Sequence, residues 1–580
     1  MVTIVKPTVG ASRNAWGPVL DAALDALNAG KAETVHSHSA FGRSTDGFVP
    51  APGGSGTTRY LREDGAWGTP AGGGGGGVGT YQGFIDVVGE YGAAGDALPI
   101  TGSITAGSAS FTISGSSFPS SGVVGKTVVI KGAGPGGVPH VATITARNSS
   151  TNVTLSANAA TTVSGASAYW GTNDTTAIIT ARDAWINGAV AYTGGNNGDR
   201  VLQKSLYFRP GKYIVTSQNA LMSSPTSGTA AVLRNGLIHG GQGTEGAEII
   251  FASTVSAATV ADKSQGNLIT AANRLHGFKI DNLKLRSLNA NQTFAYLWCS
   301  VTNDGGQFPG FGSGSQRRIQ WTNLDFKGDW QWGIALDGDT AANLNSEQYL
   351  ANIYISDTTT FSVAFFHSGV TDPATNAQQD QFVNYIIENC ILEYANGSAF
   401  KFDRGGHITC IGGSFVGGVG GSGTVKFFDF SRGGGNYWKC HLAVIGTRFE
   451  MRTATSRVLY SEWRDQIAHV SFENCAMSAN AVPGTTEETT PFIEIVNTST
   501  TSVGHGSYRF VNCEIPGYIR FSGSSTQSFG RIVFDQCNFT HSKSAAISTE
   551  AAGTGYIQYA GSYAPKYRFR DCWNITDAAN

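Results

Sequence analysis

Two aspartates and two tryptophans lie close together near the middle of the sequence and could act on a sugar. Asp337 and Asp339 are two positions apart, so on a strand they would face the same side about 6.6 Å from each other. This separation is at the short edge of the range found between the acid and the base of inverting glycosidases. Trp330 and Trp332 could stack on sugar rings. The alternative is an Asp-Gly turn flanked by core or surface tryptophans.

A second cluster combines an aromatic ring with charges in a chain that has few charged residues. Glu462, Trp463 and Arg464 are consecutive and are followed by another acid, Asp465. This segment is either a patch that binds glycan or a surface turn that forms an ion pair between subunits. Both alternatives place it at the surface of the protein.

The pair His36 and His38 is the best candidate for metal ligands. In an extended chain, residues two apart point to the same side, so three parallel copies would aim six imidazoles at a common axis. Six nitrogen ligands suit an octahedral transition metal. The alternative is two solvated histidines in a linker.

Composition and charge restrict the kind of chain that must position these residues. Of 580 residues, 77 are glycine and only 14% are charged, whereas 41% are hydrophobic, which favours a folded, mostly β protein. Lys and Arg number 39 against 41 Asp and Glu, and no basic block stands out, so no nucleic acid partner is expected. No apolar stretch is long enough to span a membrane. Residues 1–7 lack a signal-peptide pattern, so we expect synthesis in a cytosol.

The first 80 residues differ from the rest. Leu20, Leu24 and Leu27 form one helical stripe, with Pro18 in the first turn and Gly30 beyond the end, so residues 1–30 are expected to contain a short amphipathic helix. Residues 31–80 are rich in Gly, Pro, Ser and Thr, and cannot close a core of their own. They end in a run of glycines, which predicts a hinge.

Two phrases in this segment carry a resemblance to a known family. The segments 48–54 and 59–70, the second containing Leu-Arg-Glu-Asp-Gly-Ala-Trp, resemble the stalk repeats of tail fibres and tailspikes of tailed bacteriophages. The resemblance implies a trimeric stalk over residues 31–80 and attachment to the virion through residues 1–30. It also implies iron as the metal held by His36 and His38, whereas no cofactor is expected for the body.

The body contains a repeat that indicates a β-solenoid. A four-residue unit recurs about every 32 residues: an apolar residue, any residue, then Asn, Asp or Gly, then a small or apolar residue. The copies are Ile280–Leu283, Trp321–Leu324, Ile355–Thr358, Ile387–Cys390, Phe472–Cys475, Phe510–Cys513, Phe534–Cys537 and Phe569–Cys572, with looser copies at Ile411–Ser414 and Ile445–Arg448. A strand can bend at an Asn in the left-handed conformation, and stacked amides can bond from coil to coil. Cys in the fourth position is expected to point into the core.

The start of the body resembles the opening of a pectate-lyase-like right-handed parallel β-helix, a fold of many phage tailspikes. The resemblance rests on the segments 91–96, 173–178 and 207–215. It implies a β-helix over residues 81–96 and 173–580, interrupted by a small β module at 97–172, and a helix after Asp174 that covers the open end. Ile178, Ala181 and Trp185 are its expected apolar face.

The function that follows from the resemblance is a tailspike or minor tail protein of a virion that recognises host surface glycan. Its expected partners are two further copies of the chain, phage tail or baseplate proteins, and bacterial surface polysaccharide. The catalytic phrases of β-helix lyases and polygalacturonases, such as paired Asp with Gly-His-Gly, are absent, which favours recognition without cleavage. A depolymerase that cuts the glycan and a purely structural tail-tip protein remain the alternatives.

Overall fold

The computed structural model divides the chain into two units, Met1–Gly79 and Thr80–Asn580. The structure describes residues 60–61, 67–68 and 83–574, except 193–199, 224–232, 243–245, 256–265, 273–274, 300–315, 339–344, 357, 370–383, 404–405, 421–422, 432–439, 464–467, 480–490, 498–505, 524–529, 541–542 and 561–563. The predicted helix in 1–30 and the predicted metal ligands His36 and His38 lie outside these residues. In the first unit, β1 (Tyr60–Leu61) pairs antiparallel with β2 (Trp67–Gly68), which joins the two ends of the stalk phrase.

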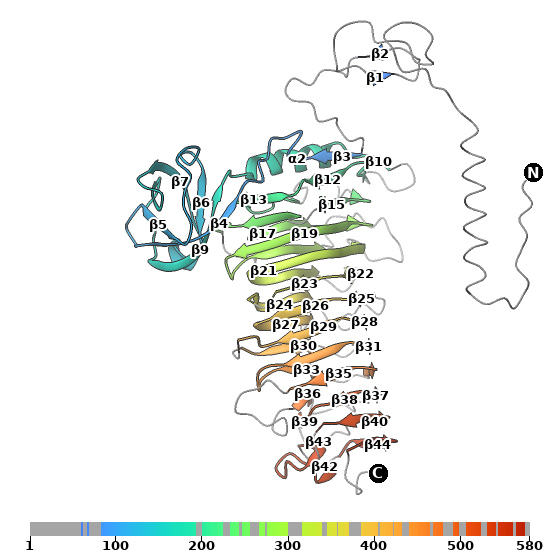
Figure 1. Ribbon diagram of the computed structural model, residues 1–580. Coiled ribbons are helices and arrows are strands. Elements are labelled where there is room, and N and C mark those ends of the chain that lie inside the picture. Colours follow the sequence, from blue (N-terminus) through green and yellow to red (C-terminus); the bar gives the residue numbers. More distant parts are fainter. Residues whose placement is uncertain are drawn as a thin grey trace, which may run out of the picture. The chain divides into compact units, whose positions relative to one another are not determined.

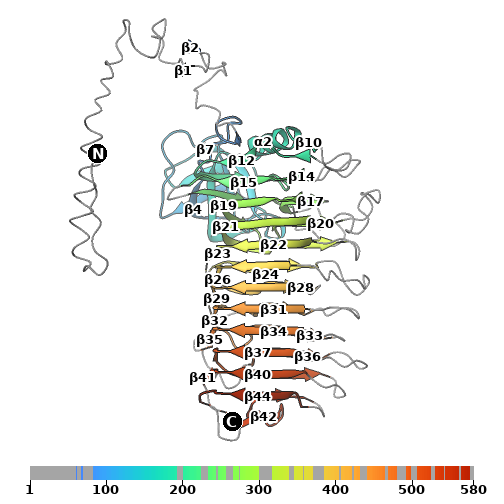
Figure 2. The ribbon, with the colours of Figure 1, turned by 90° about the vertical axis from the view of Figure 1, so that its right-hand side faces the viewer.

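The second unit is a right-handed parallel β-helix, as the sequence predicts (Figures 1 and 2). Most coils contribute a strand to each of three parallel sheets. Sheet 1 contains β3 (Phe84–Asp86), β12 (Ser205–Phe208), β15 (Leu237–Gly240), β22 (Asn345–Ala351), β25 (Asn384–Glu388), β28 (Gly406–Ile411), β31 (Cys440–Ile445), β34 (Ala468–Glu473), β37 (Ser507–Val511), β40 (Arg531–Asp535) and β44 (Lys566–Arg570).

Sheets 2 and 3 follow in each coil. Sheet 2 contains β13 (Gly211–Val215), β16 (Ala247–Phe251), β23 (Tyr354–Ile355), β26 (Ile391–Tyr394), β29 (Ser414–Gly417), β32 (Arg448–Met451), β35 (Ala476–Ser478), β38 (Glu514–Ile515) and β41 (Asn538–Phe539). Sheet 3 contains β17 (Asn267–Ala272), β20 (Thr293–Cys299), β24 (Thr360–Ser368), β27 (Asn396–Phe402), β30 (Val425–Phe430), β33 (Arg457–Trp463), β36 (Pro491–Asn497), β39 (Tyr518–Gly523), β43 (Gly555–Tyr559) and β42 (Ala545–Thr549).

A few strands depart from this scheme. β19 (Lys279–Leu288) belongs to sheets 1 and 2, and β21 (Gln316–Gly338) runs through all three. Short strands precede sheet 1 in the early coils, namely β11 (Arg200–Val201), β14 (Leu233–Arg234) and β18 (Leu275–His276), and β10 (Val190–Ala191) pairs antiparallel with β11.

The corner between sheets 1 and 2 is where the repeated unit falls. Its third residue has a positive φ of 48–54° at Asn282, Asn323, Asn352, Asn389, Asn474, Asn512, Gln536 and Asp571. Amides stack as predicted at two steps: Asn352 donates to Asn323 (3.1 Å) and Asn512 donates to Asn474 (2.7 Å). The predicted unit at Ile355–Thr358 is wrong, because Leu350–Ile353 occupies the corner and Ile355 lies within sheet 2.

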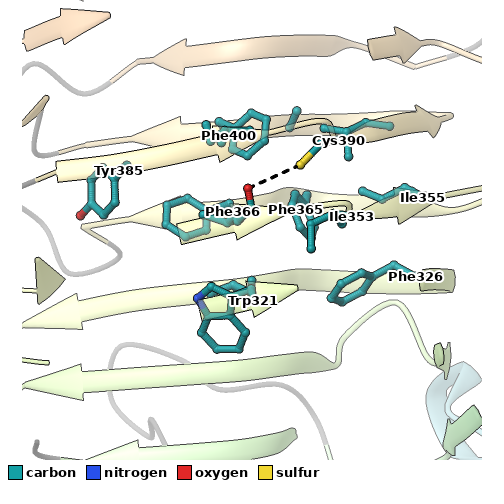
Figure 3. Close-up of a cluster of buried hydrophobic side chains, with 14 of the residues drawn as sticks. Trp321, Phe326, Ile353, Ile355, Phe365, Phe366, Tyr385, Cys390 and Phe400 are labelled. Atoms are coloured by element: carbon teal, nitrogen blue, oxygen red, sulfur yellow. Dashed lines mark hydrogen bonds between the residues drawn. The ribbon is translucent and has the colours of Figure 1, made fainter. Parts of the chain in front are cut away.

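The core of the β-helix is apolar and rich in aromatic rings (Figure 3), and in the later coils the rings stack from coil to coil. Phe472, Phe510, Phe534 and Phe569 follow one another at centroid distances of 5.0–5.4 Å with nearly parallel planes. The cysteines of the repeated unit lie inside this core, as predicted, except Cys572 in the last coil, which is partly exposed. Burial of these rings is the main contribution to the stability of the coils.

The helix α2 (Thr175–Asn187) covers the end of the β-helix beside β3 and β12 (Figure 1). It buries Ile178, Ala181 and Trp185, which confirms the predicted apolar face. Asp174 stands at the N-cap, but its carboxylate accepts hydrogen bonds from the backbone of Ala94 (2.6 Å) and Gly95 (3.3 Å) and not from the helix. Burial raises the pKa of Asp174 to about 6.

A closed antiparallel barrel forms between the first and second coils. Its strands are β4 (Leu98–Ile104), β5 (Ser110–Ser114), β6 (Thr127–Ile130), β7 (His140–Arg147), β8 (Asn152–Leu155) and β9 (Val163–Gly171). Val129 and Tyr169 pack against Ile214, Ile250 and other buried residues of sheet 2. Lys131 forms an ion pair with Asp329 of β21. The barrel therefore packs directly on the flank of the β-helix.

Candidate functional site

The two clusters that the sequence singled out both lie on sheet 3. Asp337 is the penultimate residue of β21, and Glu462 and Trp463 end β33. The register from β21 through β24, β27 and β30 to β33 aligns Ala335 with Tyr460, four coils apart, and Asp337 and Glu462 each lie two residues further along their strands. At a coil spacing of about 4.8 Å, their backbones are roughly 19 Å apart. The two clusters are thus separate places on one elongated face.

The predicted aspartate pair stays a prediction, because the structure describes only part of it. Asp337 and Gly338 still pair with β20, so strand geometry extends to Gly338, and no turn begins at Asp337. Asp339 and Arg464 lie outside the described residues. For Asp337 and Trp463 the structure describes the backbone alone.

The two tryptophans before the pair point to opposite sides of sheet 3. Trp330 is fully buried in the core, and its indole N–H donates to the carbonyl of Lys327 (3.0 Å). The prediction that Trp330 stacks on sugars is therefore wrong, since its ring has no solvent-facing surface. Trp332 points outward, is 7% exposed and packs edge-on against Tyr296 at 6.1 Å.

Next to Trp332 lies a buried charged cluster that sequence motifs did not reveal. The Nε2 of His367 is 2.8 Å from one carboxylate oxygen of Asp403, and Lys401 donates to the other at 2.6 Å. Lys401 also donates to Ser431 (2.9 Å). The His367 ring is 6.2 Å from the Trp332 ring. Both His367 and Asp403 are at most 5% exposed.

Ionisation states in this cluster follow from its contacts. Burial by itself would raise the pKa of Asp403, but the hydrogen bonds and charges of His367 and Lys401 outweigh it and hold the pKa below its ordinary value. Asp403 is therefore ionised at neutral pH and accepts a hydrogen bond from the Nε2–H of His367. The other ring nitrogen, Nδ1, is buried and has no hydrogen-bond partner in the described structure.

The same face continues with further ion pairs in the next coils. Asp429 accepts a hydrogen bond from Ser398 (2.7 Å) and lies 3.6 Å from Lys426. The Lys426 ammonium is 3.5 Å from the centre of the Tyr460 ring, and Tyr460 donates to Glu462 (2.9 Å). The candidate Glu462 is thus held in a network and is partly exposed.

Farther along, one carboxylate joins two arginines. Glu494 contacts Arg457 (3.0 Å) and Arg520 (3.4 Å), and Arg520 also contacts Glu550 (2.6 Å). Each cation of this face therefore has an acidic partner, so the side chains are fixed and the charges are balanced.

One outward-facing column of residues runs along sheet 3 through these clusters, and we call it the sheet 3 row. Each member pairs in register with the next: Tyr296, Ala335, His367, Lys401, Asp429, Tyr460, Glu494, Arg520 and Gln558. Neighbouring positions on the same strands point into the core. The members are about 30 residues apart in sequence, so only the register of the coils could have revealed them.

The chemistry available here is recognition of polar ligands by the partly exposed hydrogen-bonding groups and the ring of Tyr460, whereas the imidazole of His367 is buried. Among the described residues, no group of three or more His, Cys, Asp or Glu could hold a metal ion. No helix in the described part of the chain is long and apolar enough to cross a membrane.

Comparison with known proteins yields only distant similarity, to solved structures. No family model and no curated protein matches the chain. Among solved structures, it is similar to the tailspike protein gp49 from Pseudomonas phage LKA1, with 9% identity and a TM-score of 0.25. The match covers 76% of this chain and 63% of that one, so the chain spans less than two thirds of that protein's length. At this level of similarity, the function has to be argued from the residues of the chain itself.

Proposed function

We propose that the chain is a tailspike of a tailed phage that recognises a polysaccharide on the bacterial surface through the outer face of sheet 3. The observation that carries this proposal is the sheet 3 row, in which fixed polar groups and aromatic rings follow the axis of the β-helix. An extended polysaccharide repeats along one direction, as the coils do. The stalk phrases support a homotrimer with a stalk over residues 31–80 that docks on other tail proteins through residues 1–30, with His36 and His38 as iron ligands.

Ion pairing in and beside the sheet 3 row suits this face to the task. Arg457, Arg520 and Lys426 are held by carboxylates, so little side-chain entropy is lost when a ligand binds. The partly exposed ring of Tyr460 offers apolar surface next to these groups. Aromatic rings and directional hydrogen bonds together match the alternating apolar and hydroxyl faces of a sugar.

A second candidate function, cleavage of the bound glycan, is favoured by His367. An imidazole whose Nε2–H is bonded to an ionised carboxylate and whose Nδ1 is without a partner has the arrangement of a general base. Asp403 would orient the ring, and Lys401 would stabilise negative charge nearby. Cleavage requires that the substrate reach the Nδ1 of His367, and this atom is buried in the structure.

One experiment tests both functions. The full-length protein is incubated with surface polysaccharides from a panel of bacteria, and both retained binding and newly formed sugar ends are measured. Glu462→Ala and Tyr460→Phe should reduce binding several-fold, whereas Tyr354→Ala, at an exposed position on sheet 2, should not. Binding of no polysaccharide, or equal effects of all three variants, would refute recognition through this face. New ends that disappear in His367→Gln would establish cleavage, and binding without new ends would exclude it.

A further inference from the structure

The outer face of sheet 1 carries a concentration of cations at the end of the β-helix opposite α2. Arg509 on β37, Arg531 on β40, and Lys566, Arg568 and Arg570 on β44 all occupy outward positions and are exposed. We call these five residues the distal cationic patch. Figure 2 shows the three strands as neighbours at the end of the stack.

The register of the coils fixes the spacing of these charges. Arg531 pairs directly with Lys566 in the next coil. Arg509 pairs with Val533, which pairs with Arg568, so Arg509 and Arg568 are two coils apart. Adjacent coils are about 4.8 Å apart, and alternate residues along a strand are about 6.6 Å apart. The patch is therefore a flat grid of cations with separations of roughly 5–10 Å.

Acidic partners do not balance this grid. Asp535 is the only acid at the outward positions of β37, β40 and β44, and it lies 3.3 Å from Arg570 and 4.0 Å from Arg509. Arg509 also lies 3.8 Å from Glu473 in the preceding coil. In the part of the chain that the structure describes, Arg531, Lys566 and Arg568 form no ion pair. The chain as a whole has a net charge of −2, so this concentration of cations is local.

Like charges directly opposite each other in a sheet are unfavourable, and the pair Arg531–Lys566 is of this kind. The sheet 3 row avoids the problem, since Lys401 pairs with Asp429 and Glu494 with Arg520. An anion that bridges neighbouring cations would remove the repulsion and gain charge-assisted hydrogen bonds from the guanidinium groups.

We propose that the distal cationic patch binds the carboxylate or phosphate groups of an acidic surface polysaccharide. The inference rests on the proposed function for its choice of a polysaccharide over other polyanions. Exposed aromatic residues at the same end, Tyr567 (42% exposed) and Trp573 (56% exposed), add ring surface for sugars. The patch would contact the charged groups of the polymer, while the sheet 3 row would read its sugar units.

The test uses the full-length protein and measures retention on immobilised polygalacturonate and on polyphosphate, with neutral dextran and single-stranded DNA as comparisons. The triple variant Arg531→Glu/Lys566→Glu/Arg568→Glu should lose at least tenfold in affinity for polygalacturonate or polyphosphate. A matched control, Arg200→Glu/Lys204→Glu/Arg318→Glu, changes the net charge equally at exposed positions outside the patch and should stay within about twofold. Raising the salt concentration should weaken the wild type more than the patch variant.

Each outcome decides one question. Loss of binding to polygalacturonate but not polyphosphate identifies carboxylate as the anion, and the reverse identifies phosphate. Equal losses in both triple variants, or no retention of the wild type on either polyanion at low salt, would refute the patch. Tighter retention on single-stranded DNA than on either probe would assign the patch to nucleic acid. If Glu462→Ala loses polysaccharide binding while its retention on the polyanions is unchanged, the two sites act separately. Failure of this inference can then be told apart from failure of the sheet 3 proposal.

Discussion

Removing the carboxylate of Asp403 is the sharpest test of the charged cluster on sheet 3. Asp403 is 3% exposed and bonds to His367 at 2.8 Å and to Lys401 at 2.6 Å. Asp403→Ala leaves an ammonium and an imidazole N–H without their acceptor in a poorly solvated place. Breaking a buried pair in this way costs about 3–5 kcal/mol.

The lower half of this range is expected here. The Lys401 side chain is 13% exposed and keeps its bond to Ser431. We therefore expect Asp403→Ala to lower the free energy of unfolding by about 3 kcal/mol. The double variant Lys401→Met/Asp403→Leu should be less destabilised, because it removes the cation together with its partner.

The assay is denaturant unfolding of the full-length variants, followed by tryptophan fluorescence. Glu550→Ala is the matched control, because Glu550 is 32% exposed and its partner Arg520 retains Glu494; its cost should be at most about 1 kcal/mol. Because the folded state lowers the pKa of Asp403, its contribution is present above the ordinary carboxyl pKa and is lost as the pH falls through the folded value. A change in Asp403→Ala no larger than in Glu550→Ala at pH 7 would refute the reasoning.

Three further predictions concern the fold. Burial raises the pKa of Asp174 to about 6, so wild-type stability should decline as the pH rises from 4 through 6, by up to about 3 kcal/mol, and pH-dependent melting of Asp174→Asn should show a flatter profile. Gly397 has a φ of +98°, and a Cβ there would lie 2.3 Å from the carbonyl oxygen of Phe361, so Gly397→Ala should destabilise by about 2 kcal/mol or more in denaturant unfolding. Trp330→Ala should cost about 3–5 kcal/mol by the same assay, and a near-neutral effect would contradict its place in the core.

The fold was largely predictable from sequence because the corner of a β-helix requires a residue type as well as a spacing. Asn tolerates the left-handed conformation that the bend demands, and Asn282, Asn323, Asn389 and Asn474 all adopt it. The prediction at Ile355–Thr358 was wrong because Leu350–Ile353 fits the same pattern five residues earlier. The hydrogen bond from Asn352 to Asn323 in the preceding coil favours Leu350–Ile353 at the corner. A local sequence pattern could not show this, because it contains no information about the neighbouring coil.

The candidate site was predictable only in part, for a related reason. Glu462 and Asp337 were found because each lies in a short stretch of unusual composition, although nothing local shows that they share one face. His367 and Asp403 are 36 residues apart and meet only because β24 and β27 are neighbours in sheet 3. Trp330 and Trp332 have the same residue type, yet a register shift of β21 between them places one ring in the core and the other outside.

In a parallel β-helix, the length of each coil determines which residues lie next to each other in adjacent coils. The charges along each outward column therefore either attract or repel each other. Along the sheet 3 row, Lys401 pairs with Asp429 and Glu494 pairs with Arg520, so attraction between adjacent coils stabilises the row. Because the charges are balanced, this face suits a ligand with little net charge. On β40 and β44, Arg531 stands on Lys566, and the repulsion remains until an anion is bound. Two faces of the β-helix are thus suited to different parts of the same polymer.

Lys566→Glu alone should therefore stabilise the fold, because it creates an attractive pair with Arg531, while it weakens retention on polygalacturonate. A variant that loses both stability and retention would show that the patch is structural.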